Sequence, residues 1–174
     1  MRKQNSYYSA ELKDFFRQTT EEILGAICSN SENAKIEQQQ TNAWCIQIEI
    51  LKKQLANFST GRIIFEYIIP RMGKRIDVVF LHSNIVFLLE FKCGDTEYRS
   101  ASLDQVYDYA LDLKNFQKES ENRLLVPILI STKANPITCD ILEHEKIITP
   151  LKCNENNIGE VISKISFMFS EEDL

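Results

Sequence analysis

The sequence lacks the features that define several protein classes. Its 174 residues include only five Gly and four Pro, which excludes collagen-like and low-complexity chains. No apolar run approaches the roughly 20 residues that a membrane-spanning helix needs, and the amino terminus has no apolar secretory segment. We therefore expect a cytoplasmic protein without a membrane partner. The net charge of -5 also excludes attachment to nucleic acid by bulk charge alone.

Cysteine and histidine are too few and too scattered for zinc chemistry. The five cysteines form no C-x-x-C pair, and the two histidines lie far apart in the chain. An odd, dispersed set of cysteines is neither a disulfide framework nor a zinc signature. Reactive groups should therefore be carboxylates, lysines, tyrosines or amides.

Hydrophobic periodicity predicts the secondary structure. Apolar residues recur at helical spacing in four segments, at about residues 8–28, 35–58, 101–118 and 158–169. Runs of β-branched, aromatic and other apolar residues predict strands at 62–69, 75–81, 85–92 and 124–130, and a short strand at 146–149. Short turns make the first three long strands an antiparallel meander, and a helical crossover makes the fourth parallel to the third.

We therefore expect one α/β domain over residues 1–174, with a central mixed sheet flanked by helices. The 44% hydrophobic content is sufficient for a core in a chain of this length. The domain would have a helical N-terminal extension over about 1–34, a core over about 35–131 and a C-terminal extension over 132–174, so extra helices lie at both ends.

Charged residues inside these apolar strands are the main functional signal. Asp77 stands between Ile76 and Val78, while Glu90 and Lys92 alternate with Phe91 and so share one face of their strand. Burying such groups is costly unless they are paired or bound to a metal. Two carboxylates on neighbouring strands can hold Mg²⁺, and an adjacent lysine can activate water or stabilise the transition state of phosphodiester hydrolysis.

This arrangement resembles the PD-(D/E)XK nuclease superfamily, whose restriction-endonuclease-like core has the order αβββαβ. Ile76 replaces the proline of the motif, a departure that affects no ligand. The run Gln105-Val106-Tyr107-Asp108-Tyr109 is similar to the Q-x-x-x-Y motif of the RecB-like branch. In that branch the glutamine and tyrosine help to hold the lysine and the DNA strand. The resemblance therefore implies supporting roles for Gln105 and Tyr109, with the carbonyl of Phe91 as a further metal ligand.

Several segments resemble the nuclease-like N-terminal region of bacterial Schlafen-group helicase proteins. They are Ala43-Trp44, Phe65–Asp77, Leu89–Gly94, Gln105–Phe116 and Val126–Leu129. A superfamily-one helicase normally follows in that family, and no Walker motif occurs in this sequence. The resemblance therefore implies an excised domain or a stand-alone relative, with a helicase partner in the full-length chain or in trans. Gln117 occupies a position at which that family often has histidine, so no role is carried over to it.

Further candidates surround these residues, and each has a simpler explanation. Glu66 is a candidate metal ligand or partner for Lys92, or else a solvent-facing charge on an edge strand. Glu49 is a candidate ligand on the preceding helix, where a solvated helix face is the default. The candidate phosphate contacts are basic residues around the strands that carry the carboxylates; scattered surface charge is the alternative. They are Arg71, Lys74, Arg75 and Arg99.

The sequence leaves two functions open. The first is a Mg²⁺- or Mn²⁺-dependent nuclease that cuts DNA, with RNA as a variant, acting in bacterial DNA maintenance or phage defence. The second is a catalytically inactive module that binds nucleic acid or protein through the same groove. Retention of Asp77, Glu90 and Lys92 favours the first, because an inactive site usually loses one of them. A homodimer is compatible with the resemblance, but no residue identifies its surface.

Overall fold

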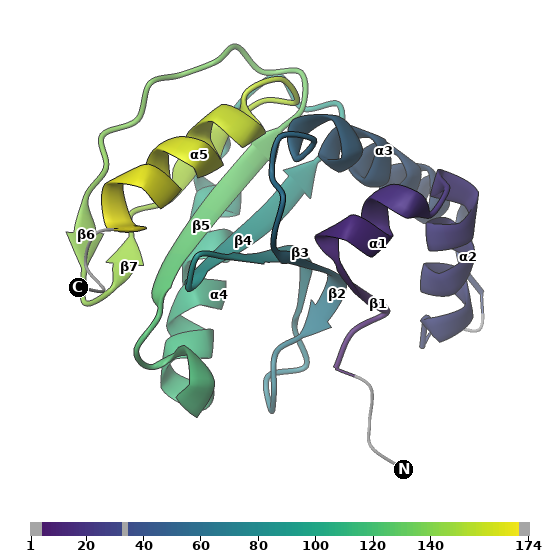
Figure 1. Ribbon diagram of the computed structural model, residues 1–174, viewed down its shortest axis with the longest axis horizontal. Helices are drawn as coiled ribbons and strands as arrows, with labels where there is room; N and C mark the ends of the chain where they lie inside the picture. Colours follow the sequence, from purple (N-terminus) through teal and green to yellow (C-terminus); the bar gives the residue numbers. More distant parts are fainter. Residues whose placement is uncertain (1–4, 33–34, 171–174) are drawn as a thin grey trace.

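A mixed β-sheet forms the centre of the fold, with helices on both faces (Figure 1). The computed structural model describes residues 5–32 and 35–170. Within these residues the sheet has eight strands, in the order β1-β2-β3-β4-β5-β7-β6, with β8 also paired to β5. The strands are β1 (Tyr8–Glu11), β2 (Arg62–Ile68), β3 (Arg75–His82), β4 (Ile85–Lys92), β5 (Leu124–Ser131), β6 (Glu143–His144), β7 (Ile147–Ile148) and β8 (Leu151–Cys153).

The strand pairing confirms the predicted meander and crossover. Strands β2, β3 and β4 pair antiparallel in succession, whereas β4 and β5 pair in parallel along their whole length. The connection between β4 and β5 contains α4 (Ser100–Phe116), as a parallel pair requires a long crossover. The molecule is therefore a mixed α/β protein whose central sheet is flanked by helices.

Two apolar layers hold the helices to the sheet. On one face, residues of α1 (Leu12–Arg17), α2 (Thr20–Asn30), α3 (Gln38–Gln54) and α5 (Ile158–Phe169) form one buried cluster with the strands. On the other face, α4 packs through Val106, Tyr109, Ala110 and Leu113. Helix α3 buries its stripe of Trp44, Ile48 and Leu51, spaced by three or four residues as an amphipathic helix requires. Helices α3 and α4 thus cover opposite faces of the sheet.

The N-terminal segment differs from the predicted single helix over 8–28. Its first residues form β1, which pairs antiparallel with the edge of β2. The helical part is split, because α1 ends at Arg17 and Thr19 caps α2 with its side chain, which accepts a hydrogen bond from the amide of Glu22. A Thr-x-x-Glu capping box marks this start in the sequence. The N-terminal extension therefore contributes a strand as well as helices.

The C-terminal part also contributes more strands than predicted. The expected strand at 146–149 is present as β7, and β6 and β8 add two further short strands. Helix α5 follows at the predicted position and lies across β5 (Figure 1). A short 3-10 helix, η1 (Lys118–Ser120), follows α4. None of the helices in the described residues combines the length and apolar character needed to cross a membrane.

Candidate active site

The candidate site lies where strands β3 and β4 separate. Their ladder ends at Val78 paired with Leu89, so the next two residues, Asp77 and Glu90, face each other beyond the last backbone pair. The side chain of Asp77 replaces the backbone acceptor that the ladder would have supplied to Phe91. Its Oδ2 accepts a hydrogen bond from the backbone amide of Phe91 at 2.8 Å. The separation therefore turns two strand residues into the floor of a cleft.

A break in strand β2 faces the same point. The paired residues Phe65 of β2 and Val78 of β3 belong to the apolar layer that contains α3. The next pair, Tyr67 and Ile76, belongs to the opposite layer, which contains α4. Residues two apart on a regular strand share a face, so both strands change face between these pairs. Glu66, at the break, has a left-handed φ of 53°, a conformation that is uncommon for a residue with a side chain. The register is thus irregular where the acidic residues gather.

A chain of side-chain contacts joins β4 to α4 across the site. Lys92 Nζ lies 3.4 Å from Glu90 Oε1 and 3.3 Å from Gln105 Oε1. The other end of the Gln105 amide, Nε2, donates to the hydroxyl of Tyr109 at 2.8 Å. The predicted pairing of Gln105 and Tyr109 at four-residue spacing therefore holds, and it positions the amine of Lys92 beside Glu90.

The two central carboxyls are held close together in a buried environment. Burial raises the pKa of Asp77 well above its ordinary value of 3.8, and the charges of Glu90 and Glu66 raise it further, against the opposing effects of the Phe91 amide and Lys92. Burial also raises the pKa of Glu90 to about 7, although Lys92 lowers it. The pair therefore resists carrying two negative charges.

Helix α3 supplies the opposite wall of a cleft of about 550 Å³ above these carboxyls. Two buried oxygens in this cleft, Glu90 Oε2 and Gln47 Oε1, have no hydrogen-bond donor among the described residues. Such unpaired buried oxygens are rare in proteins and call for an explanation. A bound cation or water would satisfy both atoms.

Gln47 replaces Glu49 as the helix residue at the site. Glu49 is exposed and does not line the cleft, so its solvated alternative is the one observed. Gln47 is only 3% exposed because it lies on the apolar side of α3, three residues after Trp44 and four before Leu51. A polar residue inside an apolar helical stripe was the signal for it in the sequence.

Glu66 is buried and already has partners. Its Oε1 accepts a hydrogen bond from Trp44 Nε1 at 3.0 Å, and its Oε2 lies 3.6 Å from Arg75 Nε. Burial raises the pKa of Glu66, while Trp44 and Arg75 act in the opposite direction. The expectation of a solvent-facing charge is wrong, and the partner of Glu66 is Arg75 rather than Lys92. Glu66 therefore serves the electrostatics of the site without lining the cleft.

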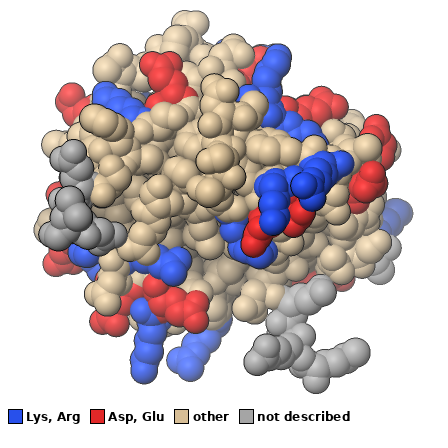
Figure 2. Space-filling model, in the orientation of Figure 1, with Lys and Arg blue, Asp and Glu red and all other residues tan. Residues whose placement is uncertain are grey.

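Three of the four predicted phosphate contacts are paired with carboxylates. Lys74 pairs with Asp112 at 3.2 Å, and Arg99 pairs with Asp95 at 3.4 Å. Arg75, besides its contact with Glu66, lies over the ring of Tyr7. The fourth residue, Arg71, is exposed in the turn between β2 and β3. Figure 2 shows basic and acidic side chains interspersed over the face that it draws, without a concentrated basic surface there.

The donor set suits a hard divalent cation in part. Among residues 5–32 and 35–170, no three His, Cys, Asp or Glu side chains are grouped as a metal cluster. The oxygens of Asp77, Glu90 and Gln47 nevertheless line one cleft, and the carbonyl of Phe91 belongs to the same segment. Mg²⁺ takes one or two carboxylates and keeps several waters, so this set fits it without a third acidic ligand.

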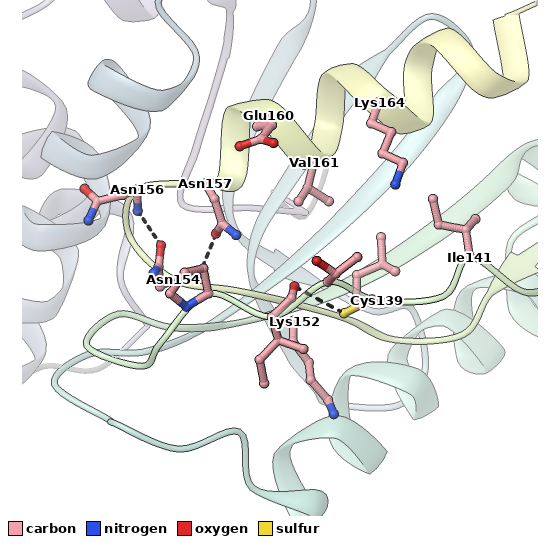
Figure 3. A pocket seen from close by; sticks show the side chains of 13 residues that line it. Cys139, Ile141, Lys152, Asn154, Asn156, Asn157, Glu160, Val161 and Lys164 are labelled. Atoms are coloured by element: carbon pink, nitrogen blue, oxygen red, sulfur yellow. Dashed lines mark hydrogen bonds between the residues drawn. The ribbon is translucent and has the colours of Figure 1, made fainter.

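A second cavity, of about 580 Å³, lies beside α5 and contains none of the predicted site residues (Figure 3). Two hydrogen bonds of 2.9 Å shape the turn that precedes the helix. The backbone amide of Asn154 donates to Asn157 Oδ1, and the backbone amide of Asn156 donates to Asn154 Oδ1. Lys164 of α5 and Cys139 of the facing loop line the same space. This cavity is therefore separate from the carboxyl cleft.

Comparison with known proteins adds little to this description. No family model matches the chain, and no curated protein matches it. Among solved structures, protein VC1899 from Vibrio cholerae is similar over 92% of this chain, with 12% sequence identity and a TM-score of 0.38. The chain spans 46% of that protein's length. A likeness at this level carries no argument, so the site is interpreted from its own residues.

Proposed function

We propose that this protein is a metal-dependent nuclease that hydrolyses phosphodiester bonds in DNA, with RNA as a further possible substrate class. The observation that carries the proposal is the chain of contacts from Glu90 through Lys92 and Gln105 to Tyr109, with Asp77 lining the same cleft. The amide of Gln105, itself bonded to the Tyr109 hydroxyl, orients the Lys92 amine, as catalysis by a lysine requires.

The order of elements supports the same proposal. The core runs α3, β2, β3, β4, α4, β5, which is the αβββαβ order of a restriction-endonuclease-like core. We therefore propose that the mixed sheet is such a core. The carboxyls occupy the ends of its second and third strands, and the helix after the third strand carries Gln105 and Tyr109.

Each residue of the site has a chemical role in this proposal. Asp77 and Glu90 would hold Mg²⁺ or Mn²⁺, with the carbonyl of Phe91 and the side-chain oxygen of Gln47 as additional oxygen donors. Bound there, the cation would polarise the phosphodiester and lower the pKa of a water molecule. Lys92 would orient the attacking water or stabilise negative charge on the phosphate oxygens.

The buried environment explains why such a site needs a cation. Burial and mutual repulsion raise the pKa of both carboxyls, so two negative charges are costly here. A divalent cation bound between them would compensate both charges. A helicase in the same full-length chain or in trans, and a role in bacterial DNA maintenance or phage defence, remain part of the proposal through the Schlafen-group resemblance alone.

The test is cleavage of single-stranded, duplex and forked DNA, and of RNA, with Mg²⁺ or Mn²⁺. Asp77→Asn and Lys92→Ala should each reduce the cleavage rate by about 100-fold or more, as loss of a metal ligand or of a positioned catalytic group typically does. Asp104→Asn and Lys164→Ala are matched controls, because both residues are exposed and lie outside the cleft. Both controls should retain the wild-type rate.

Circular dichroism and thermal unfolding would show that each variant folds. Cleavage that survives both site substitutions would refute the assignment. A wild type that binds nucleic acid without cutting it would instead support the inactive binding module. Titration calorimetry with Mn²⁺ gives an independent readout, because binding should be lost in Asp77→Asn and retained in Asp104→Asn.

A further inference from the structure

The residues that α3 itself contributes to the cleft are uncharged amides and apolar side chains, and the acidic Glu37 lies just before the helix. Gln39, Asn42 and Gln47 line the cleft from this helix, and Ile46 lies between them. Ile46 is 40% exposed, although most other large apolar residues of α3 are buried in the core. The Asn42 side chain is held by a hydrogen bond from Gln38 Nε2 at 2.9 Å.

This combination of groups suits a nucleobase better than a phosphate. Amide side chains donate to and accept from base edges, and apolar side chains such as Ile pack against base faces. Phosphate binding depends on Lys and Arg. Lys92 lies in the cleft beside Glu90, and Arg99, which does not line the cleft, is paired with Asp95, which does. The α3 wall therefore contains groups that can contact a base, but no Lys or Arg that would bind a phosphate.

The depth of the carboxyls adds a geometric requirement. The side chain of Glu90 is only 6% exposed, and α3 rises on the opposite side of the cleft. A phosphodiester that reaches the carboxyls must therefore enter a recess of about 550 Å³. In a duplex the faces of the bases are stacked and their Watson–Crick edges are paired, so only the groove edges can be contacted, whereas a single strand also presents the faces.

We propose that the α3 wall, defined here as Gln39, Asn42 and Ile46, binds an unpaired nucleobase next to the phosphodiester at the carboxyls. The protein would therefore act on single-stranded nucleic acid or on unpaired ends and flaps. Ile46 contacts the face of the base, and the amides contact its edge. This inference rests on the proposed nuclease function and names its substrate class.

The binding test uses two fluorescent single strands of equal length, one with all its bases and one built from abasic sugars. They carry the same phosphate charge, so a difference in affinity reports base contacts. In fluorescence anisotropy with the wild-type protein, the base-containing strand should bind at least about fivefold more tightly, as expected for contact with one base.

Ile46→Ala should remove much of that difference by weakening only the base-containing strand. Ile46→Leu should restore it, because leucine keeps an apolar side chain of the same volume. Phe116→Ala is the matched control, since Phe116 is also apolar and 50% exposed but lies at the end of α4 outside the cleft. This control should bind both strands as the wild type does.

Cleavage kinetics separate this inference from the proposed function. Single strands and flaps should be cut at least about tenfold faster than blunt duplex. Equal binding of both strands by the wild type, equal loss for both strands in Ile46→Ala, or equal cleavage of duplex and single strand would overturn the base-binding wall while leaving the nuclease intact. A wild type that neither binds nor cuts any strand would overturn both proposals.

Discussion

Replacing Glu90 with glutamine should stabilise the metal-free protein at neutral pH, although Glu90 belongs to the proposed active site. Glu90 is buried, its pKa is raised from 4.5 to about 7, and it lies against Asp77. The folded protein must therefore bury a charge that the unfolded chain leaves in water. Glutamine has a similar shape without that charge, so the cost disappears.

The pKa of Glu90 sets the magnitude and the pH range. Because the folded-state pKa lies above the unfolded value, the native protein binds more protons, and its stability decreases as pH rises between them. The rise from 4.5 to about 7 corresponds to about 3 kcal/mol, at about 1.4 kcal/mol for each pH unit. The contribution of Glu90 to the free energy of unfolding is fully present below pH 4.5 and is lost above pH 7. This pKa already includes the attraction of Lys92 for the charged carboxylate, so the net gain in Glu90→Gln is about 3 kcal/mol.

The assay is urea denaturation of the wild type and Glu90→Gln in EDTA between pH 4 and pH 8. The two proteins should differ little at pH 4, and the variant should be more stable by about 3 kcal/mol at pH 8. Glu160→Gln, at an exposed position of α5, is the control and should show no such trend. A difference that stays constant with pH, or a wild type that is more stable at pH 8, would refute the reasoning. Added Mg²⁺ should stabilise the wild type but not Glu90→Gln.

Three positions in or beside helices give shorter tests by urea denaturation. Gly159→Ala should destabilise the protein by about 1–3 kcal/mol, since its Cβ would lie 2.3 Å from the carbonyl oxygen of Gln54; an unchanged stability would contradict this packing. Gly25→Ala, within α2 and with no atom within 4 Å of the added Cβ, should instead stabilise by about 0.5–1 kcal/mol, and any loss would argue against an open site. Thr19→Ala should cost about 1 kcal/mol because the bond from the Glu22 amide is lost, whereas Thr19→Ser should be nearly neutral.

The sequence by itself identified the elements whose residues show a strong local pattern. The β-branched and aromatic runs of β2, β3 and β4 and the apolar run of β5 predicted four strands, and the stripes of α3, α4 and α5 predicted three helices. It missed β1, because Tyr8–Glu11 has neither β-branched residues nor clean alternation and is a strand through its pairing with β2. Strands of two or three residues, such as β6 and β8, are likewise too short to carry a period.

The candidate site follows the same division. Asp77, Glu90 and Lys92 stood out in the sequence because charges interrupt apolar strands, and Gln105 and Tyr109 because four-residue spacing places them on one helix face. Their mutual contacts depend on the register of β3 with β4 and on the packing of α4. Those are long-range properties.

Only the tertiary structure decided which neighbours complete the site. The rotation of α3 about its axis turns Gln47 toward the cleft and leaves Glu49 in solvent. The break in β2 directs Glu66 to Trp44 and Arg75. Local sequence determines which residues share a face of an element, because that depends only on the period of the backbone. The partner that each face meets depends on how elements distant in the chain pack together, and no local pattern contains that information.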